Sequence, residues 1–243
     1  MTKKLDVFPS AHSFHEDDVR DKVVVMIDVL RASSTIAAAL QNGAKGVIPA
    51  GDMETAAKIA QNLDFNKFLL SGEKNGIKIE SFHLGNSPLE HSPETVKGKT
   101  IILNTTNGTK AIKRAAKAKK ILVGSFLNLA AVVDYLEQID DEAVLVCAGW
   151  RGHLSFEDLL CAGNIIYEIT SGRLPEKARD GTKTAFGLFE KFGDDIEKAV
   201  KSSDYAERLR EIVSEDDLSF CCQVSKTRVL PAMNEGIITD FNG

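Results

Sequence analysis

The chain has 243 residues, of which 43% are hydrophobic and 27% charged, and its formal net charge is −5. This length suits one sizeable α/β domain or two small ones, with an apolar core that needs no disulfides. The acidic balance and the lack of a long Lys and Arg run argue against nucleic acid as a partner. Because the sequence has neither a signal-peptide pattern nor a stretch of about 18 apolar residues, we expect a cytoplasmic protein that does not contact membranes.

Apolar, β-branched segments alternate with helical patterns along the chain. Strands are predicted at residues 5–8, 23–27, 46–50, 68–70, 100–103, 121–123 and 143–147, and helices at 35–40, 53–61, 110–118, 129–137, 156–170, 183–192, 194–201 and 203–213. Uninterrupted apolar strands such as 23–27 are typical of a parallel sheet with helices on both faces. We therefore predict a three-layer α/β/α fold with a largely parallel or mixed sheet and two related halves. It would form a single domain over residues 1–243, or two intertwined subdomains.

Three predicted loops lead from a buried strand into a helix and are rich in Gly, Ser, Thr and Asn. They cover residues 28–35, 104–109 and 148–158. Such loops direct backbone N–H groups and the positive end of a helix at one point, which suits an anion. Three of them together indicate a small, highly charged substrate.

The first of these loops carries the richest set of polar groups. Asp28 ends the strand 23–27, where side chains of open α/β sheets reach the ligand crevice. The guanidinium of Arg31 and three hydroxyl groups are suited to oxyanion recognition, the hydroxyls being those of Ser33, Ser34 and Thr35. The alternative for this segment is an ordinary helix cap with a surface arginine.

The second loop repeats these groups without an arginine. Its candidate anion contacts are Thr105, Thr106, Asn107, Gly108 and Thr109. A glycine here lets the backbone approach a ligand closely, and a simple turn would need fewer hydroxyls.

Four acidic residues lie in these polar loops or close to them, namely Asp28, Glu73, Glu157 and Asp158. A few oxygen ligands of this kind fit Mg²⁺, which keeps several waters and bridges to phosphate. Each carboxylate taken alone would also suit a helix cap or a solvated surface. Leu30 stands where a haloacid-dehalogenase phosphatase has its second aspartate, so that type of aspartyl nucleophile is not supported. Signatures of ATP and dinucleotide binding are absent too, and Cys147 precedes Arg151 by too few residues for a thiol phosphatase.

Six sequence blocks in this order and spacing closely resemble the 2-phosphosulfolactate phosphatase family. They are residues 27–35 with 42–44, then 72–73, 84–88, 105–109, 147–149 and 157–163. The resemblance implies a Mg²⁺-dependent phosphatase that converts 2-phospho-3-sulfolactate to 3-sulfolactate, a step towards coenzyme M. Such a substrate carries phosphate, carboxylate and sulfonate groups, which would explain three anion-directed loops.

The same resemblance suggests roles for the candidate residues. Mg²⁺ would lie on Asp28 with Glu73 or Asp158, next to a phosphate held by Arg31 and the hydroxyl-rich loops. Arg151, with Asn86 and Ser87, would hold the carboxylate and sulfonate. Two alternatives stay open, a phosphatase for another phosphorylated 2-hydroxy acid and a non-catalytic anion-binding protein. A homo-oligomer is compatible with the sequence, and residues 171–215 offer no residue with an obvious chemical role.

Overall fold

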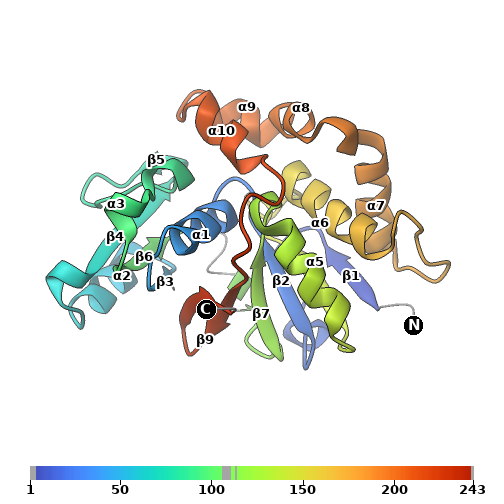
Figure 1. The fold of residues 1–243 in the computed structure, drawn as a ribbon, viewed down its shortest axis with the longest axis horizontal. Helices are drawn as coiled ribbons and strands as arrows, with labels where there is room; N and C mark the ends of the chain where they lie inside the picture. The colour runs from blue at the N-terminus through green and yellow to red at the C-terminus, as the bar shows by residue number, and fades with distance from the viewer. Residues whose placement is uncertain (1–3, 106–110, 113, 242–243) are drawn as a thin grey trace.

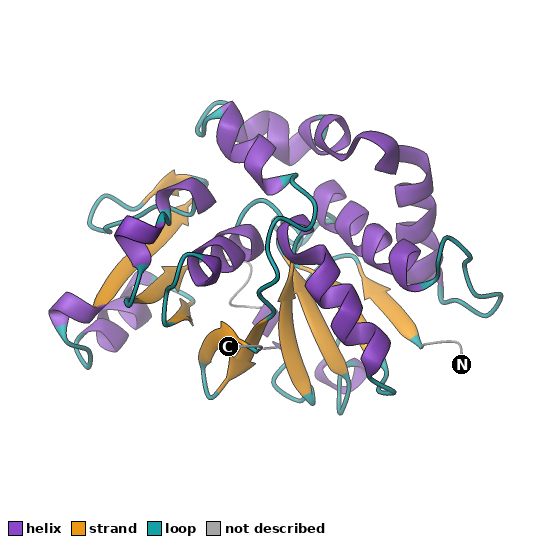
Figure 2. Ribbon diagram, viewed as in Figure 1, coloured by secondary structure: helices purple, strands orange, loops and turns teal. Residues whose placement is uncertain are grey.

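In the computed structural model, residues 4–105, 111–112 and 114–241 are described. Within these residues, ten strands form one mixed, largely parallel sheet in the order β1-β8-β2-β7-β9-β10-β3-β6-β4-β5, with helices packed around it (Figures 1 and 2). The predicted α/β class is confirmed. None of the helices in the described ranges is both long and apolar enough to cross a bilayer.

The first parallel block of the sheet contains the most buried strands. It consists of β1 (Leu5–Phe8), β8 (Ala143–Cys147), β2 (Val23–Ile27) and β7 (Lys120–Gly124). β2 lies between β8 and β7, and all five of its residues are buried, as its unbroken apolar sequence predicts. β1 is the edge strand, paired with β8 alone in the sheet order.

The second parallel block consists of β3 (Gly46–Ala50), β6 (Thr100–Asn104) and β4 (Phe68–Lys74), with the short antiparallel β5 (Ile77–Lys78) at its edge. β4 is longer than the predicted strand 68–70. The difference arises at Gly72, which pairs with Asn104 across the sheet. A Cβ at Gly72 would lie only 2.4 Å from the Asn104 carbonyl oxygen, so this glycine permits a close strand contact rather than a turn.

A hairpin of β9 (Pro231–Asn234) and β10 (Ile237–Asp240) joins the two blocks. β9 is antiparallel to β7 through the pair Leu122 and Ala232, and β10 is antiparallel to β3 through Val47 and Ile238. The segment after residue 218 thus returns to the core of the sheet. The division into one domain or two subdomains stays a prediction.

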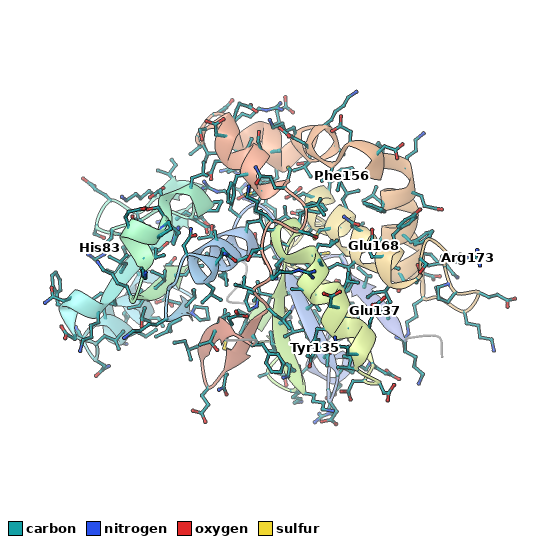
Figure 3. All side chains as sticks on the ribbon, in the orientation of Figure 1. His83, Tyr135, Glu137, Phe156, Glu168 and Arg173 are labelled. Carbon is teal, nitrogen blue, oxygen red and sulfur yellow. The ribbon has the colours of Figure 1, made fainter. Side chains whose placement is uncertain are left out.

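Helices cover both faces of the sheet. In the second block, α1 (Ala32–Gln41) packs on Ile101 and Leu103, and α2 (Met53–Ala60) packs on the opposite face, which carries Ile102. In the first block, α5 (Leu129–Gln138) and α6 (Phe156–Ile169) share one face. Glu137 and Glu168 lie on the solvent side (Figure 3), whereas Glu157 and Asp158 in the first turn of α6 are buried. Each helix thus presents an apolar stripe to the strands, as expected for a layered α/β fold.

The remaining helices follow α6. They are α7 (Asp180–Phe192), α8 (Ile196–Lys201), α9 (Asp204–Leu209) and α10 (Glu215–Cys221), while the short α3 (Pro93–Val96) precedes β6. In Figure 1 helices α8 to α10 form an arch at the top, from the end of α7 towards β5. This arch lies over the loops that leave β2 and β8, which is the region of the predicted site.

Candidate active site

The loops that follow β2, β6 and β8 meet at one place, together with the end of β4. Asp28, Ser33, Thr105 and Ala148 line one small cavity, although they come from three separate loops. The convergence that the sequence predicted is therefore observed for the described part of these loops. The other predicted anion contacts of the second loop lie outside the described residues, namely Thr106, Asn107, Gly108 and Thr109.

The hydroxyl groups of the first loop bond to the backbone. Ser33 Oγ accepts a hydrogen bond of 2.9 Å from the N–H of Asp28, and the Ser34 hydroxyl donates to the Val29 carbonyl at 2.8 Å. The Thr35 hydroxyl donates to the Asn86 carbonyl at 3.1 Å. All three residues lie in the first turn of α1, which begins three residues earlier than predicted. Their observed contacts therefore hold the loop in shape around Asp28.

Asp28 lies in an environment that disfavours its charge. The pKa of Asp28 is raised from 3.8 to about 7, chiefly by burial and also by the neighbouring carboxyls of Glu73 and Glu157, against the N–H of Ala32 and the charge of Arg31. Burial also raises the pKa of Glu157. Because these groups act on one another, the structure brings the predicted acidic residues into one electrostatic site.

Asp158 connects two of the loops. Its carboxylate accepts hydrogen bonds from the N–H of Val29 at 2.8 Å and from the N–H of Gly149 at 3.2 Å, one on each oxygen. Burial, followed by Glu157 and Asp28, raises the pKa of its carboxyl. The observed contacts give Asp158 a positioning role, and its predicted part in catalysis or metal binding stays a prediction.

Arg31 is buried and fixed by two partners. It forms an ion pair with Asp217 of α10 and donates to the Gly76 carbonyl at 3.0 Å. Ser87 Oγ donates to the other oxygen of Asp217 at 2.7 Å. The guanidinium is thus held beside Asp28 by a residue 186 positions away in the chain. Sequence reasoning missed Asp217, because nothing in an acidic helix start distinguishes a buried partner from an ordinary cap.

A second group of residues that the sequence did not assign covers the acidic site. Tyr205 of α9 is largely buried, and its pKa is raised by burial first and then by the charges of Asp28 and Glu73. Its ring lies 5.5 Å from that of Trp150, in the loop after β8. The segment 171–215 therefore does contribute to the site, although no motif in it signalled this.

The other predicted anion contacts are divided between two sides of the site. Ser87 is on the Arg31 side through its bond to Asp217, and Thr35 bonds the Asn86 carbonyl nearby. Arg151 is instead exposed, with its guanidinium 4.7 Å from the centre of the Trp150 ring. No contact joins Arg151 to Asn86 or Ser87 in the described part of the chain.

Three buried side-chain atoms have no hydrogen-bond partner within the described residues. They are Asn86 Oδ1, Asn104 Nδ2 and Glu157 Oε2. An unpartnered buried polar atom costs about 1–3 kcal/mol, so such atoms are rare in stable proteins. All three belong to the polar segments that the sequence singled out. They offer two acceptors, which suit a cation or a donor, and one donor, which suits an oxyanion.

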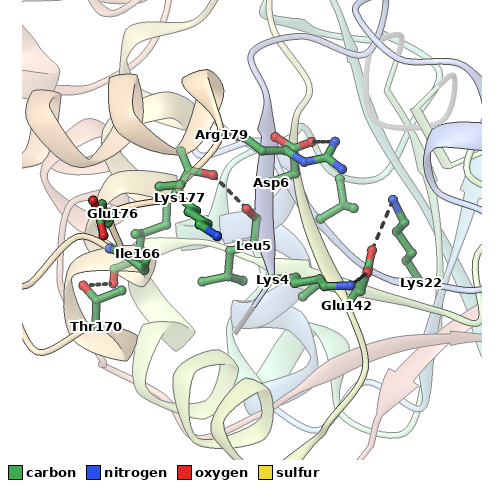
Figure 4. A pocket seen from close by; sticks show the side chains of 15 residues that line it. Lys4, Leu5, Asp6, Lys22, Glu142, Ile166, Thr170, Glu176, Lys177 and Arg179 are labelled. Carbon is green, nitrogen blue, oxygen red and sulfur yellow. Dashed lines mark hydrogen bonds and ion pairs between the residues drawn. The ribbon is translucent and has the colours of Figure 1, made fainter. Parts of the chain in front are cut away.

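A second, larger cavity lies away from these residues. It has a volume of about 670 Å³ and is bordered by the amino ends of β1 and β8 and by the loop before α7 (Figure 4). Its charged residues are paired with one another, as in Lys4 with Glu142 and Arg179 with Asp6. None of the predicted site residues lines it, so its size does not mark the reaction site.

The four predicted Mg²⁺ ligands do not form a closed ligand shell. Within the described ranges, no group of three or more His, Cys, Asp or Glu side chains is arranged to hold a metal ion. Mg²⁺ nevertheless binds in many enzymes through one or two carboxylates, waters and substrate phosphate. Asp28 and Glu73, with the unpartnered Oε2 of Glu157, fit that open type of site.

Buried carboxyls, a fixed guanidinium and unpartnered polar atoms at one edge of a largely parallel sheet define an α/β enzyme with a site for a charged ligand. The protein-family model for 2-phosphosulpholactate phosphatase matches residues 8–236. The chain belongs to the 2-phosphosulfolactate phosphatase family and thus to the phosphoric monoester hydrolases.

Individual relatives agree with the family match over nearly their whole length. A protein of Caldanaerobacter subterraneus subsp. tengcongensis is 41% identical over 234 residues, which cover 96% of this chain and 97% of the relative. A protein of Clostridium acetobutylicum is 37% identical over 235 residues, covering 97% and 99%. Both are described as probable 2-phosphosulfolactate phosphatases.

Proposed function

We propose that this protein hydrolyses 2-phospho-3-sulfolactate to 3-sulfolactate and inorganic phosphate, with Mg²⁺ as its cofactor. The observation that carries the proposal is the set of three unpartnered buried atoms, on Asn86, Asn104 and Glu157, around the converging loops. A ligand with several anionic oxygens and a cation would satisfy all three. Membership of the family supports this choice of substrate.

Asp28 and Glu73 would hold the Mg²⁺, with Glu157 Oε2 in reach of the ion or of a water bound to it. When bound, the ion would withdraw negative charge from the phosphoryl oxygens. Such an ion would also favour the ionised form of Asp28, whose pKa is raised to about 7 by burial and by the neighbouring carboxyls.

The protein's own residues would bind and orient the phosphate. Arg31 carries a positive charge whose position is set by Asp217 and Gly76, so little reorganisation is needed when charge develops on the phosphoryl group. Asp158 keeps the amides of Val29 and Gly149, and with them two loops, at a constant separation. The hydroxyl of Tyr205 keeps its proton at neutral pH because its pKa is raised, and it can donate a hydrogen bond at the acidic site.

The direct test is phosphate release from 2-phospho-3-sulfolactate, phospholactate and phosphoglycolate, with Mg²⁺ and with EDTA, at mildly acidic pH. We expect turnover that needs the metal and favours the sulfonated substrate. Asp28→Asn should lower kcat by at least about a hundredfold, a typical cost for losing a group that acts in the transition state. The matched control is Asp134→Asn, which changes the charge equally at an exposed residue of α5.

The other outcomes correspond to the two remaining functions. Equal turnover of all three substrates would identify a general phosphatase for phosphorylated 2-hydroxy acids. If none were hydrolysed while 3-sulfolactate or phosphate still bound, the protein would be an anion-binding protein. Full activity in EDTA would show that the reaction does not need the proposed Mg²⁺.

A further inference from the structure

Trp150 is the centre of a cluster that the proposed reaction does not yet use. Its ring lies 5.5 Å from the Tyr205 ring, and the guanidinium carbons of Arg151 and Arg208 lie 4.7 Å and 4.9 Å from its centre. Trp150 and Arg151 belong to the loop after β8, whereas Tyr205 and Arg208 belong to α9. The cluster therefore joins α9 to the loop after β8.

The two guanidiniums of this cluster lie over one ring and have no counter-charge among the described residues. Both distances are measured to the centre of the Trp150 ring, so the separation of the two guanidinium carbons cannot exceed the sum of the two distances. Within the part of the chain that is described, no carboxylate lies at ion-pair distance from Arg151 or Arg208. Two like charges on one indole repel each other, and an anion between them would remove that repulsion. Arg151 is exposed and Arg208 is partly exposed, so a ligand can reach both.

The position of the cluster relates it to the reaction site. Tyr205 is near enough to Asp28 and Glu73 for their charges to act on it, and it stacks on Trp150 with its ring. Gly149, the neighbour of Trp150, donates its N–H to Asp158. The two arginines are therefore linked to the acidic site through Trp150, its neighbour Gly149 and Tyr205. A ligand whose phosphate reached Asp28 would extend its other end towards the arginines.

We propose that Arg208 and Arg151, stacked on Trp150, bind the sulfonate group of the substrate and give the enzyme its preference for a sulfonated phosphate ester. This inference rests on the proposed function. Guanidinium groups match tetrahedral oxyanions through paired N–H donors, and stacking on an aromatic ring fixes their orientation. The arrangement differs from the sequence-based expectation, in which Arg151 acts with Asn86 and Ser87, because Ser87 is bonded to Asp217 and, within the described residues, has no contact with Arg151.

The test compares Arg208→Gln with Arg210→Gln. Arg210 is two residues away and pairs with Glu215, so its replacement removes the same charge from the same segment. For each protein we would measure kcat/KM for 2-phospho-3-sulfolactate and for phospholactate, which lacks the sulfonate. In Arg208→Gln the preference for the sulfonated substrate should fall about ten- to a hundredfold, the typical value of a hydrogen bond to a charged group. In Arg210→Gln it should change by less than about twofold, as is usual for an exposed ion pair.

Binding of 3-sulfolactate by calorimetry tests the same point without turnover. Arg208→Gln and Arg151→Gln should each weaken this binding, and the double variant should lose less than the sum of the two, because both groups would hold one anion. If wild-type protein did not bind 3-sulfolactate, or Arg208→Gln bound it equally well, the inference would be wrong, whatever the hydrolysis assay gave. Equal losses of kcat/KM for both substrates in Arg208→Gln would also contradict it. Binding that depends on Arg208 in a protein without phosphatase activity would instead contradict only the proposed reaction.

Discussion

Asp28→Asn isolates the effect of burial on the central carboxyl group. Asparagine has the shape of the neutral acid and retains an oxygen for the N–H of Ala32. In the folded protein without metal, the pKa of Asp28 is raised from 3.8 to about 7, chiefly by burial. The folded state therefore holds a proton on Asp28 at pH values where the unfolded chain has lost it. As the pH rises from about 4 to about 7, the wild-type protein should lose free energy of unfolding, and the loss should level off above pH 7.

The magnitude follows from the same pKa values. One pKa unit corresponds to about 1.4 kcal/mol, so a rise from 3.8 to about 7 gives an upper limit of about 4 kcal/mol. Asp28 retains some exposure and titrates together with Glu157, so we expect about 2 kcal/mol. Asp28→Asn carries no charge and avoids this cost. The variant should be about equally stable at pH 4, and more stable than wild type by that amount at pH 8, while being inactive.

Urea unfolding in EDTA at pH 4, 5, 6, 7 and 8 measures this difference directly. Asp134→Asn serves as the control, because its exposed carboxyl should leave the pH profile unchanged. A difference between Asp28→Asn and wild type that does not vary with pH would refute the argument, since titration of Asp28, coupled to that of Glu157, should make it vary in this range. A destabilised Asp28→Asn at pH 8 would refute it as well.

Four further substitutions test the packing and the buried ion pair. Gly163→Ala should destabilise the fold by about 1–3 kcal/mol, because its Cβ would lie 2.1 Å from the carbonyl oxygen of Ala185 on α7. Gly187→Ala, on α7 with open space around it, should instead stabilise the fold by about 0.5–1 kcal/mol. Thermal unfolding measures both values. Asp217→Asn should cost about 3–5 kcal/mol in urea unfolding and lower activity, because it leaves a buried guanidinium without its counter-charge. Leu160→Ala should cost about 2–5 kcal/mol by the same method, because this side chain is fully buried between α6 and the sheet.

Opposite results would locate the error in each case. Equal melting temperatures for Gly163→Ala and Gly187→Ala would show that α6 and α7 separate easily. Little effect of Asp217→Asn would mean that Arg31 is held by its other partner or by solvent. A Leu160→Ala variant as stable as wild type would show that the neighbouring core collapses into the space.

The strands of the first block were predictable because a strand that is buried on both faces has an unbroken run of apolar residues in the sequence. Segments 23–27 and 143–147 are unbroken apolar runs, and each proved to be a fully buried strand. The run 68–70 gave only the beginning of β4, since the polar residues after it continue the strand. In this part of β4 the apolar pattern of a strand is interrupted by Gly72, whose role depends on its pairing with Asn104 of β6.

The acidic site was predictable for a related reason. A carboxylate at the end of a buried strand, as at Asp28, has a place in the fold that follows from local sequence. Asp217 and Tyr205 come from amphipathic helices far along the chain, and their burial depends on how the arch of helices folds back. Local patterns contain no information about that arrangement. Local patterns therefore predicted Asp28 and missed Asp217 and Tyr205.

The hairpin of β9 and β10 has a consequence for synthesis on the ribosome. The two parallel blocks are connected in the sheet through this hairpin, and it follows all the other strands in the chain. A growing chain can complete the strands of both blocks, yet the continuous sheet cannot form until residue 240 has left the exit tunnel. During that interval β7 and β3 expose edges that could pair with other nascent chains. We expect this protein to depend on chaperones late in translation, rather than early, and ribosome-bound chains that stop before residue 231 to be the ones that chaperones retain.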